Sequence, residues 1–127
     1  MTIKEVSTLY GLTEDTLRYY ERVGVVPSVA RTAGGRRDYT EEDTAWVELA
    51  CCLRSASLPV AVIAEYVRLT QQGDGTIGAR LELLEGQREK LLLQRRKLDA
   101  ALERLDYKIE RYREAEQTGE LTWGECE

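Results

Sequence analysis

A proline-free segment near the C-terminal end constrains the fold more than any other feature of this sequence. Between Thr76 and Glu116 apolar residues recur at every seventh position, and a second apolar series lies four residues after members of the first. This is the a/d heptad pattern of a coiled-coil helix. With a rise of about 1.5 Å per residue, residues 76–116 would form a helix about 60 Å long.

The apolar stripe of such a helix is too long to be covered by the remainder of the chain. We therefore predict that residues 76–116 are a dimerisation helix that pairs with the same helix of a second copy. Arg88 and Arg95 stand within the heptad series, where charges cost stability but can set register. The predicted seam comprises Leu84, Leu91, Leu98, Leu102, Leu105, Ile109 and Tyr112.

The composition excludes several classes of protein. With 127 residues, 43% hydrophobic and 32% charged, the chain is too apolar to be disordered and long enough for one small domain plus an extension. No apolar run is long enough for a membrane span, and MTIKEVSTLYG lacks a signal-peptide core, so we expect a cytoplasmic protein. Its thiols Cys51, Cys52 and Cys126 would then be reduced.

Histidine is absent, which removes a histidine base, a Cys–His nucleophile pair and histidine metal ligands. The three cysteines also lack the C-x-x-C spacing of a structural zinc site. We therefore predict that the protein is not an enzyme and that it needs no metal and no cofactor.

Two short helices joined by a tight turn are predicted at the start of the chain. Residues 3–10 form the first, which Gly11 ends, and Thr13 caps a second helix that Gly24 ends. Such a pair is a helix-turn-helix unit, whose second helix can enter the major groove of DNA. The pattern therefore favours a DNA-binding head.

The segment after this pair predicts a wing and two further helices. Gly34-Gly35 lies between short extended stretches within residues 25–40, which is a β-hairpin signal. A helix capped by Thr40 and another that starts near Pro59 follow. The expected organisation is a DNA-binding domain at residues 1–72, the dimerisation helix at 76–116 and a short flexible tail at 117–127.

Basic charge is concentrated where the helix-turn-helix prediction places the DNA. The net charge of −5 argues weakly against DNA binding, because phosphates attract Lys and Arg. Residues 18–39, however, carry five arginines against two acids, whereas residues 73–127 carry ten basic and thirteen acidic residues. The local excess supports a DNA-binding face in the first part of the chain.

Three motifs give the chain a family resemblance. Residues 16–24 read TLRYYERVG, residues 35–39 read GRRDY, and Glu42-Asp43 follow. Together they resemble the MerR family of bacterial transcription regulators over about residues 1–70, and the coiled coil stands where that family has one. One departure is Ser57-Leu58-Pro59, where the family usually has glycine followed by a Ser or Thr cap.

The resemblance implies a mostly α-helical fold: a winged helix-turn-helix head with a small β-hairpin wing, a helix pair, and a long C-terminal helix that forms an antiparallel coiled coil. It implies a homodimer that binds a near-palindromic double-stranded operator. Bending and untwisting of promoter DNA would then act on RNA polymerase indirectly. The predicted DNA contacts are Thr13, Arg18, Tyr19, Tyr20, Arg36, Arg37 and Tyr39.

The resemblance is closest to a small branch of the family without a large effector domain, which senses aldehydes or nitrosothiols through one cysteine. It points to Cys52 as the sensing residue, although free cysteines in a helix are more often small core residues. Two alternatives stay open. One is an architectural DNA-binding protein that responds to no effector, and the other is a coiled-coil adaptor that does not bind DNA.

Overall fold

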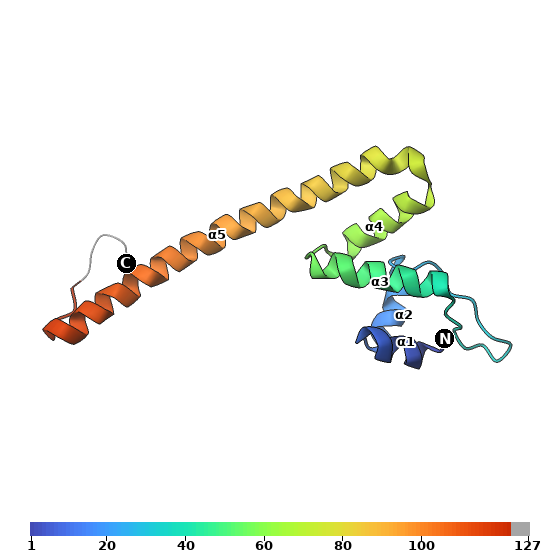
Figure 1. Ribbon diagram of the computed structural model, residues 1–127, viewed down its shortest axis with the longest axis horizontal. Coiled ribbons are helices and arrows are strands. Elements are labelled where there is room, and N and C mark those ends of the chain that lie inside the picture. Colours follow the sequence, from blue (N-terminus) through green and yellow to red (C-terminus); the bar gives the residue numbers. More distant parts are fainter. Residues whose placement is uncertain (123–127) are drawn as a thin grey trace. The chain divides into compact units, whose positions relative to one another are not determined.

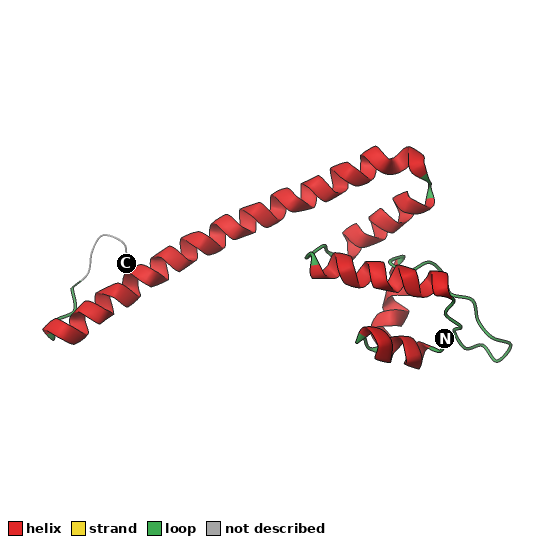
Figure 2. Cartoon of the chain, in the orientation of Figure 1, coloured by secondary structure: helices red, strands yellow, loops and turns green. Residues whose placement is uncertain are grey.

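The structure is a computed structural model that describes residues 1–122; Cys126 and the end of the predicted tail lie outside them. The described chain is mostly helical, as predicted (Figures 1 and 2). No helix in this part of the chain is apolar enough over a sufficient length to cross a membrane. The elements are α1 (Ile3–Tyr10), α2 (Glu14–Val23), α3 (Glu41–Ser55), α4 (Val60–Gln71), the 3-10 helix η1 (Asp74–Thr76) and α5 (Ile77–Thr118).

Contacts within the chain separate two compact units, Met1–Gln87 and a second from Arg88 onward. In the first unit, which we call the head, α1 packs on α2 and α3, and α3 packs on α4. Leu17 and Tyr20, three residues apart on α2, lie in its core. The most deeply buried large side chains are Leu17, Ile63, Val6, Val25, Val26, Val47 and Val67.

Capping side chains begin the first three helices where the sequence predicts. Thr2 and Glu5 form a complete capping box at α1, and Thr40 and Asp43 form another at α3. Each box satisfies two backbone N–H groups that would otherwise lack a partner. The starts of these helices therefore depend on residues within one helical turn, which the sequence alone displays.

The expected β-hairpin wing is wrong in one respect: no strand forms in residues 1–122, as Figure 2 shows for the loop before α3. The two arms of this loop are joined by an antiparallel bridge from Arg31 to Arg37, the one bridge among the described residues. The reason lies in the backbone donors on either side of the bridge, which bond elsewhere. Thr40 N–H, which would face the other arm in a longer ladder, donates to Asp43 Oδ2 in the capping box of α3 at 2.9 Å. Toward the tip, Arg36 N–H donates to Thr32 Oγ1 at 3.3 Å.

The linker between α4 and α5 is an ordered turn. Gly73 has a φ of 94°, which favours glycine. Thr76 Oγ1 donates to Leu69 O at 2.6 Å, and Arg80 Nη2 donates to Gly73 O at 2.9 Å. These bonds tie the end of α4 to the first turn of α5.

The predicted long helix is confirmed as α5, a continuous helix of 42 residues. The boundary between the two units falls inside it, between Gln87 and Arg88. All seven residues of the predicted seam are exposed in the single chain. After α5, Arg111 Nε donates to Thr122 O at 2.9 Å, so the described start of the tail lies against the helix.

Candidate nucleic-acid interface

Helices α1 and α2 form the two-helix unit that the sequence predicts. Gly11 ends α1 with a left-handed φ of 67°, and the next N–H, that of Leu12, donates to Ser7 O at 3.2 Å. Thr13 Oγ1 then accepts a hydrogen bond from Thr16 N at 3.0 Å and so begins α2. This close turn and the contact between the helices are typical of a helix-turn-helix.

The exposed face of α2 presents cationic and aromatic groups. Arg18 donates from Nη1 to Asp15 Oδ1 at 2.9 Å, and its Nη2 lies 3.4 Å from Glu14 Oε1. The guanidinium carbon of Arg22 lies 5.2 Å from the centre of the Tyr19 ring, a cation–π contact. Both arginines and Tyr19 are exposed, so this face can reach an anionic partner.

A cleft of about 570 Å³ separates α2 and the start of α1 from the loop that carries the arginine bridge. Its wall contains two acids, Glu14 and Asp38, against a larger number of cations. The cations are Lys4, Arg18, Arg31, Arg36 and Arg37. Guanidinium groups around a concave surface suit a phosphate, because they offer several charge-assisted hydrogen bonds at once.

Glu21 of α2 holds the loop through two hydrogen bonds. Its Oε1 lies 2.5 Å from Arg37 Nε, and its Oε2 accepts from Val29 N at 3.2 Å. Burial by itself raises the pKa of Glu21, but the hydrogen bonds from Arg37 and Val29 outweigh it, and the pKa is lowered from its ordinary value. The carboxylate is therefore charged at neutral pH and keeps Arg37 in place.

Two of the tyrosines predicted to contact DNA belong to the core. Tyr20 and Tyr39 are buried, and the Tyr39 hydroxyl has no hydrogen-bond partner among the described residues. Burial raises the pKa of Tyr39, so its hydroxyl stays protonated. The structure thus separates Thr13, Arg18, Tyr19 and Arg36, whose side chains are exposed, from these two rings behind the surface.

Comparison with known proteins decides the family. Residues 1–70 match the model of the MerR HTH family regulatory proteins. This chain belongs to the MerR family. AdhR, an HTH-type transcriptional regulator of Bacillus subtilis, is 46% identical over 92 residues, which are 72% of this chain and 66% of AdhR.

Solved structures agree with this assignment to the MerR family. A MerR family transcriptional regulator from Listeria monocytogenes has a TM-score of 0.75 and 38% identity, with 88% of this chain and 85% of that chain covered. HiNmlR, a MerR family regulator that lacks the sensor domain and was solved bound to promoter DNA, has a TM-score of 0.70 and 32% identity. That match covers 94% of this chain and 95% of HiNmlR.

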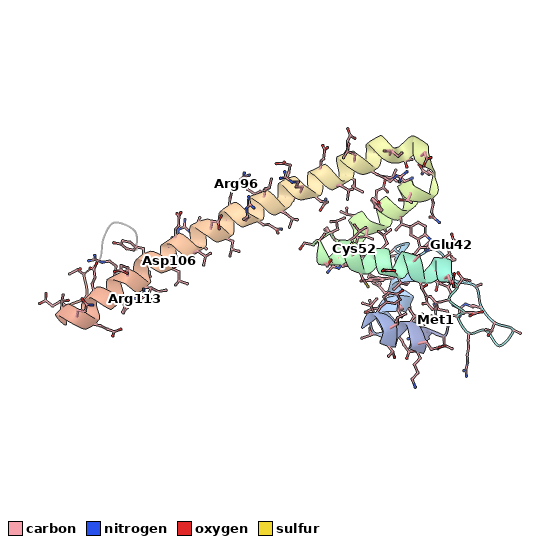
Figure 3. All side chains as sticks on the ribbon, viewed as in Figure 1. Met1, Glu42, Cys52, Arg96, Asp106 and Arg113 are labelled. Carbon is pink, nitrogen blue, oxygen red and sulfur yellow. The ribbon has the colours of Figure 1, made fainter. Side chains whose placement is uncertain are left out.

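The two cysteines of this MerR-family head differ in environment. Cys52 is exposed on α3, where Figure 3 labels it, whereas Cys51 is partly buried. Burial, with a smaller effect of Glu48, raises the pKa of the Cys51 thiol. Within residues 1–122 no group of Cys, Asp and Glu side chains could hold a metal ion. Of the two, Cys52 is the thiol that is more accessible to a reagent in solution.

The sequence prediction did not include three residues that shape this interface: Lys4, Glu21 and Arg31. Arg31 could have been found from its place opposite Arg37 across the Gly34-Gly35 turn. Lys4 and Glu21 carry no such signal, because each reaches the interface only once α1 and the loop pack beside α2.

Proposed function

We propose that this chain is a transcription regulator that binds double-stranded operator DNA through the α2 face and the neighbouring cleft. The observation that carries the proposal is the cationic cleft beside the exposed face of α2, in a chain whose net charge is −5. Family membership supports it, as does the solved complex of HiNmlR with promoter DNA. A protein bound to chromosomal promoters would work in the cytoplasm.

The proposed contacts can be tested by the salt dependence of binding. The wild-type protein first selects its operator from a random duplex library, and affinities are then measured by fluorescence anisotropy over a range of salt. Arg18→Ala and Arg36→Ala should each weaken binding and reduce the slope of log affinity against log salt by about 2, because the bound dimer loses one phosphate contact in each protomer. Arg96→Ala, an exposed arginine on α5 (Figure 3), is the matched control and should change neither.

Failure of the wild-type protein to prefer any duplex, or to bind duplex DNA even at low salt, would contradict the proposal. That result would favour the alternative of a coiled-coil adaptor. Arginine variants on the head that behave like Arg96→Ala would place the interface elsewhere.

We also propose that α5 pairs with the α5 of a second copy as an antiparallel coiled coil. The heptad series and the exposure of its seam residues support pairing, and the family resemblance supports the antiparallel direction. Leu98 lies midway between Leu84 and Tyr112 in the seam. An antiparallel pair centred there brings Leu84 of one copy near Tyr112 of the other.

Cysteine cross-linking distinguishes the two directions. In a background without the native cysteines, mixed Leu84→Cys and Tyr112→Cys chains should form a disulfide with each other. Leu84→Cys alone should not cross-link to itself. Self-linking of Leu84→Cys would mean a parallel pair, and a monomer in solution would exclude the coiled coil.

We further propose that the bound dimer bends and untwists promoter DNA, which changes access for RNA polymerase. Smooth bending of a 20–30 base-pair site costs on the order of 1–6 kcal/mol. A change in dimer geometry can therefore supply the free-energy difference between a straight and a bent promoter. Gel mobility of circularly permuted operators should show a bend. A straight duplex in the complex would contradict this part of the proposal.

A second candidate function, thiol sensing, rests on the exposure of Cys52. Formaldehyde or a nitrosothiol should change expression of a reporter driven by the selected operator. Cys52→Ser should abolish the response, whereas Cys51→Ser is the control for loss of a neighbouring, partly buried thiol. An unchanged response in Cys52→Ser would favour another sensor, and no response at all would favour the architectural alternative.

A further inference from the structure

The proposed interface contains an acidic residue whose carboxylate is fully engaged inside the protein. Both Glu21 oxygens accept hydrogen bonds, one from Arg37 Nε at 2.5 Å and one from Val29 N at 3.2 Å. The side chains of Glu21 and Arg37 are only 14% and 18% exposed. The contacts join α2 to both arms of the loop, because Val29 precedes the arginine bridge and Arg37 belongs to it.

Arg36 and Arg37 are neighbours in sequence but face different environments. Arg36 is exposed and lines the cleft beside α2. Arg37 also borders that cleft, yet its Nε is directed to Glu21. The difference lies in the Glu21 carboxylate, which accepts a hydrogen bond from Arg37 Nε and holds that guanidinium at the partly buried edge of the cleft.

We propose that Glu21 is a positioning residue for DNA binding and that Arg37 is its anchor rather than a phosphate contact. The Glu21–Arg37 pair, with the bond from Val29, holds the loop against α2 so that Arg31 and Arg36 stand at the cleft before DNA arrives. This inference rests on the proposed function and refines the expectation that Arg36 and Arg37 act alike.

The direction in which Glu21→Gln changes the affinity for DNA distinguishes a positioning residue from an acid that only repels phosphates. A carboxylate at a DNA-binding surface repels phosphates, so its removal ordinarily tightens binding. If Glu21 holds the loop, Glu21→Gln weakens binding, because the binding-competent position of the loop is then only partly populated in the free protein. The contacts made in the complex stay the same, so the salt slope stays the same.

The test compares Arg36→Gln, Arg37→Gln, Glu21→Gln and the double variant Glu21→Gln/Arg37→Gln on the operator selected by the wild-type protein. Arg36→Gln should lower the affinity and reduce the salt slope by about 2, one phosphate contact for each protomer of the dimer. Each substitution in the pair should lower the affinity by about tenfold at an unchanged slope, as expected when one partner of a partly buried ion pair is removed. The double variant should bind no more weakly than either single variant, because each single substitution already removes the same Glu21–Arg37 contact.

Two outcomes would overturn the inference. Tighter binding by Glu21→Gln would show an ordinary repulsive acid, and a slope reduced in Arg37→Gln as in Arg36→Gln would show a phosphate contact. Urea unfolding without DNA measures the pair independently: the two single substitutions should lower the midpoint non-additively. If wild-type protein selects no operator, the proposed function fails, while this unfolding result still decides whether Glu21 and Arg37 are coupled.

Arg37→Lys covers the case in which Glu21→Gln does not fold. It keeps the positive charge but loses the Nε donor, so it should weaken DNA binding by roughly threefold at an unchanged slope. If Arg37→Lys binds DNA with wild-type affinity, a positive charge at position 37 is sufficient without the Nε hydrogen bond to Glu21. The positioning role would then be rejected.

Discussion

Replacing Ser57 by glycine is expected to stabilise the head, because Ser57 occupies a backbone conformation that suits glycine. Its φ of 68° is the only positive value at a non-glycine residue within the part of the chain that the structure describes. Two bonds close the end of α3: Ser57 N–H donates to Arg54 O at 2.9 Å and Leu58 N–H to Leu53 O at 3.1 Å. This is the Schellman pattern, in which glycine commonly occupies the position of Ser57.

The expected gain follows from two opposing contributions to the free energy of unfolding. A left-handed conformation costs an L-residue about 1–2 kcal/mol, which glycine avoids. Glycine loses more chain entropy on folding, at a cost of about 0.5–1 kcal/mol. Ser57→Gly should therefore gain about 0.5–1 kcal/mol. Ser57→Val should lose about 1 kcal/mol, because a β-branched side chain tolerates positive φ poorly.

Urea unfolding followed by circular dichroism measures these changes, at one fixed protein concentration because dimerisation affects apparent stability. Ser55→Gly is the matched control: the same substitution two residues earlier, at the last residue of α3, has no left-handed strain to relieve and should not stabilise the head. If Ser57→Gly is no more stable than Ser57→Val, the strain argument is refuted.

Three further predictions concern charge, thiol reactivity and assembly. The lowered pKa of Glu21 means that its stabilising contribution is complete above its ordinary value of 4.5 and disappears as pH falls through the lower folded value. The stability difference between wild type and Glu21→Gln should therefore vanish in acid; a difference that persists at low pH would contradict the pairing with Arg37. In a Cys126→Ser background, a thiol reagent followed by mass spectrometry should modify exposed Cys52 before Cys51, whose pKa is raised by burial; the reverse order would contradict the assigned environments. Leu98→Asp should halve the particle mass in light scattering and leave the circular dichroism of the head unchanged, whereas an intact dimer would exclude the proposed seam.

Much of the helical framework could be predicted from the sequence because its determinants are local. The caps at Thr2, Thr13 and Thr40 act within three residues of themselves, and the heptad series of α5 repeats within two turns. Glycine at position 24 ends α2 in the expected left-handed conformation, with φ of 88°. Such signals need no knowledge of which segments pack together.

The wing and the detailed interface depended on contacts between distant residues. Val29 bonds to Glu21, eight positions away, and Tyr39 bonds to the carbonyl of Met1 at the start of the chain. These bonds fix the two arms of the loop outside the single bridge, against α2 and the N-terminus, and Tyr39 is buried there. No periodicity in the sequence records them, because they exist only after the loop has packed on α2.

The sequence by itself determined the helix-turn-helix, the long helix with its heptads, and the basic character of the first part of the chain. The tertiary structure alone decided which charged side chains face outward, since Arg36 and Arg37 are chemically identical neighbours. The partly buried carboxylate of Glu21 separates them: it pairs with the Arg37 guanidinium at the edge of the cleft, whereas Arg36 is exposed within the cleft. A difference of this kind depends on distance and solvent exposure, which the order of residues does not contain.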